Sequence, residues 1–129
     1  MKKIITLSLL SLFTIIVFTN CSKTRQLKNR LVGTWNIDNF TCSGTGHTNI
    51  GTITFNDDGS GTKTGHSYSC QDWTDYPFTW TNTDTKVTLT ETKSSSSSVR
   101  IFTIVTNEKT KQTWTTTEGT DNLIVTFSK

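Results

Sequence analysis

The architecture of this 129-residue chain follows from one stretch, Leu31-Val32-Gly33-Thr34-Trp35-Asn36-Ile37. Gly33, Trp35 and Ile37 share one face and the intervening residues share the other, and this period of two predicts a half-buried strand. A glycine two residues before a tryptophan suits a place where another strand comes close while a large ring fills the interior. The stretch therefore predicts the first strand of a β-rich domain.

Short alternating segments follow this stretch, with turn-forming residues between them. They are residues 50–55, 60–68, 76–81, 86–92, 99–106, 111–117 and 123–129. Asn56-Asp57-Asp58-Gly59 is a hairpin signal, because Asp-Gly supplies the positive φ of a tight turn. Residues 40–49, residues 70–75 and the serine run 94–98 are expected to be loops. Consecutive hairpins and the absence of alanine predict an all-β protein, an antiparallel up-and-down barrel of about eight strands.

The N-terminus has the pattern of an export signal. Met1-Lys2-Lys3 is positively charged, and the apolar run 4–18 is shorter than the ~20 residues that a spanning helix needs. The run ends at Phe18-Thr19-Asn20-Cys21, which looks like a bacterial lipobox with an unusually large residue before the cysteine. We expect residues 1–20 to be a signal peptide and Cys21 to be acylated, for example with palmitate. The protein would then be anchored in the bacterial cell envelope, at the outer membrane; the alternative is ordinary secretion.

The formal net charge of +3 is misleading about partners. From Leu31 onward there are seven basic and ten acidic residues, so the predicted barrel, residues 31–129, carries a net charge of −3. The basic excess lies in the segment 21–30, with Lys23, Arg25, Lys28 and Arg30. Nucleic acid is therefore not an expected partner. We interpret 21–30 as a basic tether that either attracts anionic lipid headgroups or keeps a linker solvated, and we expect residues 22–30 either to form one helical turn that closes the barrel base or to be disordered.

Gly33-Thr34-Trp35 and the hairpin 51–61, combined with the lipobox, the length and the meander, resemble the small lipocalin-like domains of bacterial envelope lipoproteins. The resemblance covers most of residues 31–129. Two features depart from it: the C-terminal helix of full-size lipocalins is missing, and Lys129 stands where those proteins have an arginine that packs across the tryptophan. The resemblance implies a monomeric barrel that binds a small apolar or amphipathic ligand at one open end. The alternative is a filled barrel that acts as a structural module, a protein-interaction module or an inhibitor.

Large rings are the candidates for lining a ligand pocket, and the competing interpretation is that they form the core. They are Trp35, Phe55, Phe78, Trp80, Phe102, Trp114 and Phe127. Small residues near them, among them Thr62 and Thr64, would leave a cavity if they faced inward and a filled core if they faced outward.

Cys42 and Cys70 are the remaining cysteines, and in an oxidising envelope they predict a disulfide. On the chain-entropy model such a bond stabilises the domain by about 3–4 kcal/mol. The rival interpretation is a zinc site made with His47 and His66, but neither half has the short spacing of strong zinc motifs, so we expect no metal.

The sequence contains no Gly-x-Ser-x-Gly elbow, no His-Glu-x-x-His and no phosphate-binding loop. We therefore expect neither an enzyme nor a cofactor. An enzymatic alternative would require His47, His66 and the loop 72–75 to converge.

Overall fold

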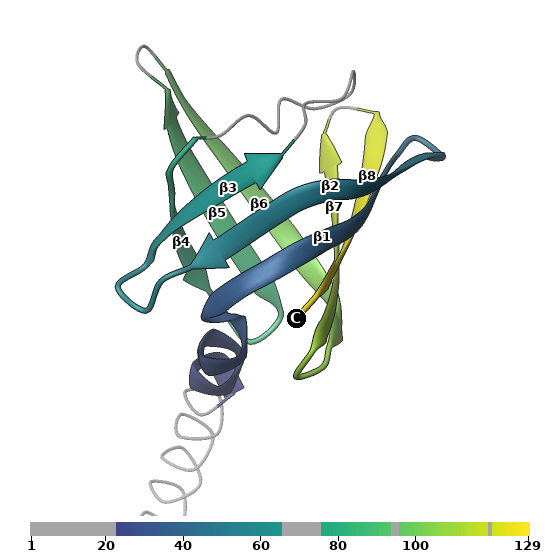
Figure 1. The fold of residues 1–129 in the computed structure, drawn as a ribbon. Helices are drawn as coiled ribbons and strands as arrows, with labels where there is room; N and C mark the ends of the chain where they lie inside the picture. Colours follow the sequence, from purple (N-terminus) through teal and green to yellow (C-terminus); the bar gives the residue numbers. More distant parts are fainter. Residues whose placement is uncertain (1–22, 66–75, 94–95, 119) are drawn as a thin grey trace, which may run out of the picture.

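The structure is a computed structural model that describes residues 23–65, 76–93, 96–118 and 120–129, except for the side chains of Asn49, Lys93 and Glu118. Eight antiparallel strands follow one another around a closed barrel (Figure 1). They are β1 Gly33–Cys42, β2 Thr45–Phe55, β3 Ser60–Gly65, β4 Phe78–Asn82, β5 Lys86–Lys93, β6 Ser96–Asn107, β7 Lys111–Glu118 and β8 Asp121–Ser128. The predicted up-and-down barrel is confirmed.

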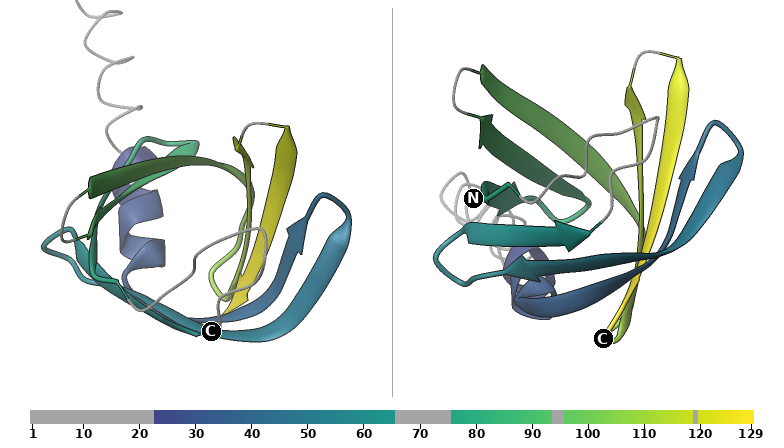
Figure 2. Two further views of the ribbon diagram at one scale, coloured as in Figure 1. Left: turned by 90° about the horizontal axis from the view of Figure 1, so that it is seen from above. Right: turned by 45° about the horizontal axis from the view of Figure 1, so that its top comes forward.

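A helical segment, residues 23–31, lies under one end of the barrel (Figures 1 and 2). Leu27 and Leu31 are buried, since they project from this segment into the interior. The Asn82 side chain donates a hydrogen bond to the carbonyl of Thr24 at 2.9 Å, and Lys28 forms an ion pair with Asp57 at 3.0 Å. The described part of the segment expected to form a tether thus contacts the barrel through Thr24, Leu27 and Lys28, and the first strand begins at Gly33 rather than Leu31. We call this end, with its β2–β3, β4–β5 and β6–β7 turns, the closed end.

Strands β1 and β2 form a long hairpin where residues 40–49 were expected to be a loop. That expectation was wrong because a β-bulge between Ile37 and Asn39 shifts the phase of β1, so that Phe40 and Cys42 continue its buried face. The hairpin turns at Ser43 and Gly44, which have φ values of 45° and 86°.

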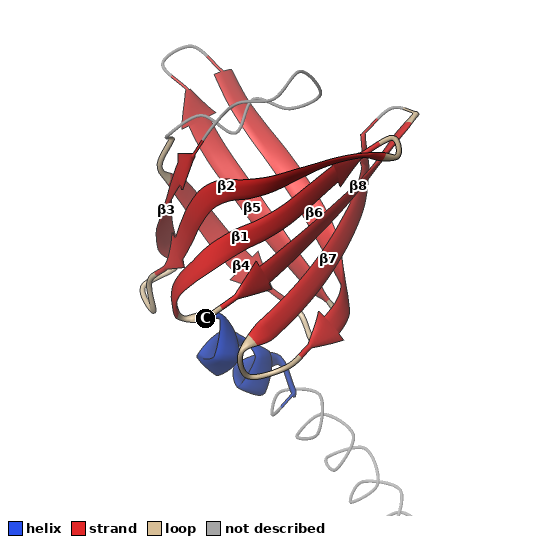
Figure 3. Cartoon of the chain, turned by 45° about the vertical axis from the view of Figure 1, so that its right-hand side comes forward, coloured by secondary structure: helices blue, strands red, loops and turns tan. Residues whose placement is uncertain are grey.

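The serine run was also expected to be a loop, but residues 96–98 belong to β6 and pair with β5 (Figure 3). Ser96 and Ser97 are exposed, so their place in the strand depends on ladder hydrogen bonds rather than on apolar burial. The most weakly paired junction lies between β3 and β4, where the register contains two residue pairs, Ser60 with Thr79 and Gly61 with Phe78. We call this junction the β3–β4 seam.

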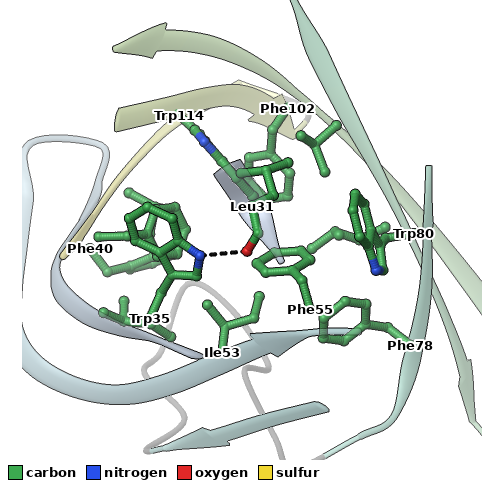
Figure 4. Close-up of a cluster of buried hydrophobic side chains, with 14 of the residues drawn as sticks. Leu31, Trp35, Phe40, Ile53, Phe55, Phe78, Trp80, Phe102 and Trp114 are labelled. Carbon is green, nitrogen blue, oxygen red and sulfur yellow. Dashed lines mark hydrogen bonds between the residues drawn. The ribbon is translucent and has the colours of Figure 1, made fainter. Parts of the chain in front are cut away.

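The inner faces of the strands and the helical segment enclose one apolar core (Figure 4). The indole N–H of Trp35 donates to the carbonyl of Leu31 at 2.7 Å, which satisfies the polar atom of the ring while its apolar body is buried. The largest fully buried side chains are Trp35, Trp114, Phe40, Phe55, Phe102 and Phe127.

Candidate ligand site at the β3–β4 seam

The seven candidate rings form a single packed cluster, and each is at most 4% exposed. Phe55 stands at the centre, with ring centroids 5.5 Å from Phe78, 5.2 Å from Trp80 and 5.7 Å from Trp114, all edge-to-face. Trp114 continues the cluster to Phe127, 4.6 Å away. These rings therefore serve one another as packing partners, and their contact with a ligand stays a prediction.

Two of the small residues that could have left a cavity, Thr62 and Thr64, face outward. Thr62 and Thr64 are exposed, and the hydroxyl of Thr64 lies 2.8 Å from that of Thr52 on the outer surface. The sequence predicts that the core is filled if these threonines face outward. Their outward position therefore indicates a filled interior beneath β2 and β3.

A hollow of about 450 Å³ lies at the β3–β4 seam. It is lined by Asn56, Ser60, Gly61, Thr62, Pro77, Phe78, Thr79, Thr90 and Thr92. Phe78 is the candidate ring that takes part in this lining, and it lies over Gly61: a Cβ there would come within 2.3 Å of the ring. The lining therefore combines the edge of the aromatic core with the hydroxyls of the outer surface.

A buried ion pair lies on the inner face of β3 and β5, whose outer faces border this hollow. Lys63 on β3 donates to Glu91 on β5, and the two side chains are 1% and 3% exposed. Arg100 on β6 places its Nη1 3.6 Å from the same carboxylate oxygen, and its side chain is 12% exposed. Glu91 is paired in register with Phe78, and Lys63 follows Gly61 by two residues. The ion pair thus joins β3 to β5 across the end of the short strand β4.

Our sequence interpretation missed these three charged residues, although a signal was present. Glu91 continues the alternation of Val87 and Leu89, and Arg100 precedes Phe102 by two residues, so both fall on inward positions. Taking charges out of water costs several kcal/mol for each ion, and a pair of apolar side chains is often at least as stable. Packing of the fold alone therefore gives little reason for charge at these positions.

Cys42 is buried on β1, whereas its predicted partner Cys70 lies outside the described residues, so the disulfide stays a prediction. His66 and the loop 72–75 also lie outside them, and His47 is half-buried on β2. Among the described residues, no three His, Cys, Asp or Glu side chains are grouped so that they could hold a metal ion. The part of the chain that the structure describes has no helix with the length and apolar character needed to cross a membrane.

Lys129 occupies the place of the missing arginine. Its Nζ lies 4.4 Å from the centroid of a Trp35 ring and donates to the carbonyls of Arg30 and Val32 at 3.0 and 2.8 Å. Gly33 leaves room for it, since a Cβ there would lie 3.3 Å from this nitrogen. Desolvation lowers the pKa of Lys129. The contact between the last strand and the tryptophan is therefore present, with a lysine in place of an arginine.

A closed eight-stranded meander, with a helix under one end and a cation over its first tryptophan, defines the class of small lipocalin-type barrels. Residues 31–111 match the family model of the lipocalin-like domain, and the chain belongs to this family. A lipocalin-like protein from Bacteroides uniformis, known from a crystal structure, is similar in fold. Its TM-score is 0.57 at 12% identity, over 78% of this chain and 98% of that chain, and so the likeness concerns the fold alone. No curated protein matches the chain.

Proposed function

We propose that this protein is a lipid-anchored lipoprotein of the bacterial envelope whose barrel binds a small amphipathic molecule at the β3–β4 seam. The observation that carries the proposal is the hollow of about 450 Å³ at the seam, where Phe78 and Pro77 meet the hydroxyls of the outer surface. This volume falls within the roughly 300–1,000 Å³ of small-molecule sites, which combine an apolar lining with a few placed polar groups.

The apolar and the polar residues of the lining fit the apolar and the polar part of an amphipathic ligand. Phe78 and Pro77 offer apolar contact to a chain or ring, and the threonine hydroxyls offer hydrogen bonds at the rim. Since the seam contains two paired positions, local separation of β3 from β4 requires few backbone hydrogen bonds to break.

A pair of matched variants tests the site. Thr90 lines the hollow and Thr88, two residues earlier on the same outer face of β5, does not; both side chains are half-buried. Thr90→Phe fills the hollow, whereas Thr88→Phe adds the same ring elsewhere. We expect native mass spectrometry to detect a co-purifying small molecule, and fatty acids to change the tryptophan fluorescence of the protein, to which Trp80 on β4 contributes. Thr90→Phe should abolish both signals and Thr88→Phe should keep them.

The second candidate function is a protein-interaction module with a filled barrel. The packed ring cluster favours it, as do Val99, Ile101 and Val105, which project from the outer face of β6 and are 59%, 53% and 65% exposed. Absence of any bound mass and of any fluorescence response in the unmodified protein would refute ligand binding and leave this module as the better account.

The anchor at Cys21 is tested separately, because this residue lies outside the described part of the chain. We expect Cys21→Ala to move the protein from the membrane fraction to the soluble fraction of the cell envelope. More than one acyl chain is expected, since a single chain binds membranes only marginally. Unchanged membrane association of the variant would contradict lipidation at this residue.

A further inference from the structure

The closed end carries most of the basic residues of the described chain. Eight basic and four acidic side chains lie on the helical segment and on or beside the three turns of this end, a net charge of +4. The basic residues are Lys23, Arg25, Lys28, Arg30, Lys86, Lys109, Lys111 and Lys129, and the acidic residues are Asp57, Asp58, Asp84 and Glu108. Figure 3 shows the helical segment at this end of the barrel. The net charge makes the surface around it positive.

Within this surface lies a second hollow, of about 460 Å³. It is lined by Gln26, Asn29, Arg30, Lys109, Thr110 and Lys129. Three cationic side chains from three separate parts of the chain therefore meet there, with two amides and a hydroxyl and without an acidic side chain in the lining. Each of these polar groups can donate a hydrogen bond to an anionic oxygen.

Two of the cations are held in place before any ligand arrives. The Arg30 guanidinium donates to the carbonyl of Asn107 at 2.8 Å, which fixes the helical segment to the end of β6. The Lys129 ammonium is held by the carbonyls of Arg30 and Val32 and by the Trp35 ring. Both side chains have lost rotamer freedom on folding, so less is lost on binding.

We propose that the closed end docks on an anionic lipid bilayer and that the hollow of Arg30, Lys109 and Lys129 receives a headgroup phosphate. The bilayer is the occupant favoured by the course of the chain. The helical segment begins within this positive surface, and the predicted acylated residue, Cys21, precedes its first described residue by two positions, a distance of about 7 Å in extended chain. The lipid surface thus comes within reach of the hollow. This inference rests on the proposed anchor for its setting, but the binding itself does not require the anchor.

The binding can be measured on residues 23–129, which contain all eight strands, their closure and the buried helical segment. Circular dichroism first checks that each variant is folded. Co-sedimentation then compares vesicles of phosphatidylcholine with vesicles in which about one third of the lipid is phosphatidylglycerol. We expect binding to the anionic vesicles that weakens as salt is raised.

Three variants distinguish the contribution of the hollow to vesicle binding from that of the overall positive charge. Lys109→Gln, in an exposed turn, should weaken binding about fivefold, as expected for one basic residue close to an anionic surface. Lys86→Gln removes the same charge at the same end but outside the hollow and should have a smaller effect. Combining Lys109→Gln with Asp121→Asn, which lies at the opposite end, restores the net charge and should not restore binding.

Three outcomes would overturn the proposal. They are equal binding to both kinds of vesicle, equal binding of Lys109→Gln and the unmodified protein, and binding of inorganic phosphate in the hollow without binding to vesicles, which would indicate a site for a free anion. The Thr90→Phe variant, which fills the hollow at the β3–β4 seam, shows whether the two proposed sites are independent. It should bind vesicles normally, so that failure of the membrane proposal and failure of the ligand proposal are distinguished.

Discussion

Replacing Glu91 by leucine should strongly destabilise the barrel, whereas replacing Lys63 and Glu91 together should not. In Glu91→Leu, the ammonium of Lys63 and the guanidinium of Arg100 lose the buried carboxylate that both face. Because the Lys63 side chain is 1% exposed, water cannot take over that role without opening the structure. Breaking such a pair from one side costs about 3–5 kcal/mol.

This loss is large for a barrel of this size. About 3–5 kcal/mol is a considerable part of the roughly 5–15 kcal/mol that separates folded from unfolded domains. At about 4–8 °C for each kcal/mol, the melting temperature should fall by about 12 °C or more. Lys63→Met combined with Glu91→Leu replaces the ion pair by apolar side chains of similar length and should regain most of the loss.

Urea denaturation followed by circular dichroism measures the four proteins of this double-mutant cycle, and equal slopes show that the unfolded states are comparable. The reasoning predicts a coupling energy of more than about 1 kcal/mol between the two positions. If the double variant loses as much stability as the two single variants added together, then the ion pair does not couple β3 to β5, and our account of the seam is refuted.

Three further predictions concern other parts of the barrel. Gly51→Ala should lower the urea midpoint far more than Gly44→Ala, since the added Cβ would lie 1.9 Å from a backbone oxygen of β3 at the first site and meets no atom within 4 Å at the second. The unreduced protein should be about 2 Da lighter than the dithiol if Cys42 and Cys70 form the predicted disulfide, and two free thiols would disprove it. Asp58 should titrate below its usual pKa of 3.8, because the hydroxyl and then the amide of the serine two residues later donate to its carboxylate. Since the folded-state pKa is the lower one, the stability this turn contributes is present above the usual pKa and lost as pH falls through the lowered value; NMR titration, with Asp58→Asn as control, measures it.

The sequence was sufficient for the architecture because the features that determine it are local. Gly33 and Trp35 alternate as the inner face of a strand requires, and Asp58-Gly59 favours a tight turn because Gly59 readily adopts the positive φ found here. The segments 76–81, 86–92 and 123–129 were also predicted correctly as strands, here β4, β5 and β8, since each has an uninterrupted period of two.

What the sequence did not show depends on contacts between distant segments. The bulge after Ile37 breaks the local alternation, and pairing with β2 and β8 is what keeps Phe40 on the inner face. The seam depends on the brevity of β4, and the burial of Lys63 depends on Glu91, 28 residues away. When strands are assigned from alternating polarity, a lysine is taken to face outward. A buried charge is therefore missed unless the inward positions are assigned from the phase of the strand alone.

Because β1 pairs with β8, the barrel can close only after the last strand has been synthesised. The first strand lies beside the last, and Lys129 reaches back to the carbonyls of Arg30 and Val32, 99 and 97 residues earlier. Contacts of such sequence separation form slowly, and they cannot form at all while the last strand is still being synthesised. Until then β1 and β7 each present an unpaired edge, which another chain can extend by pairing with it. A chain that still lacks β8 therefore leaves both edges open to pairing with its copies, and the arrival of β8 and Lys129 closes the barrel over Trp35.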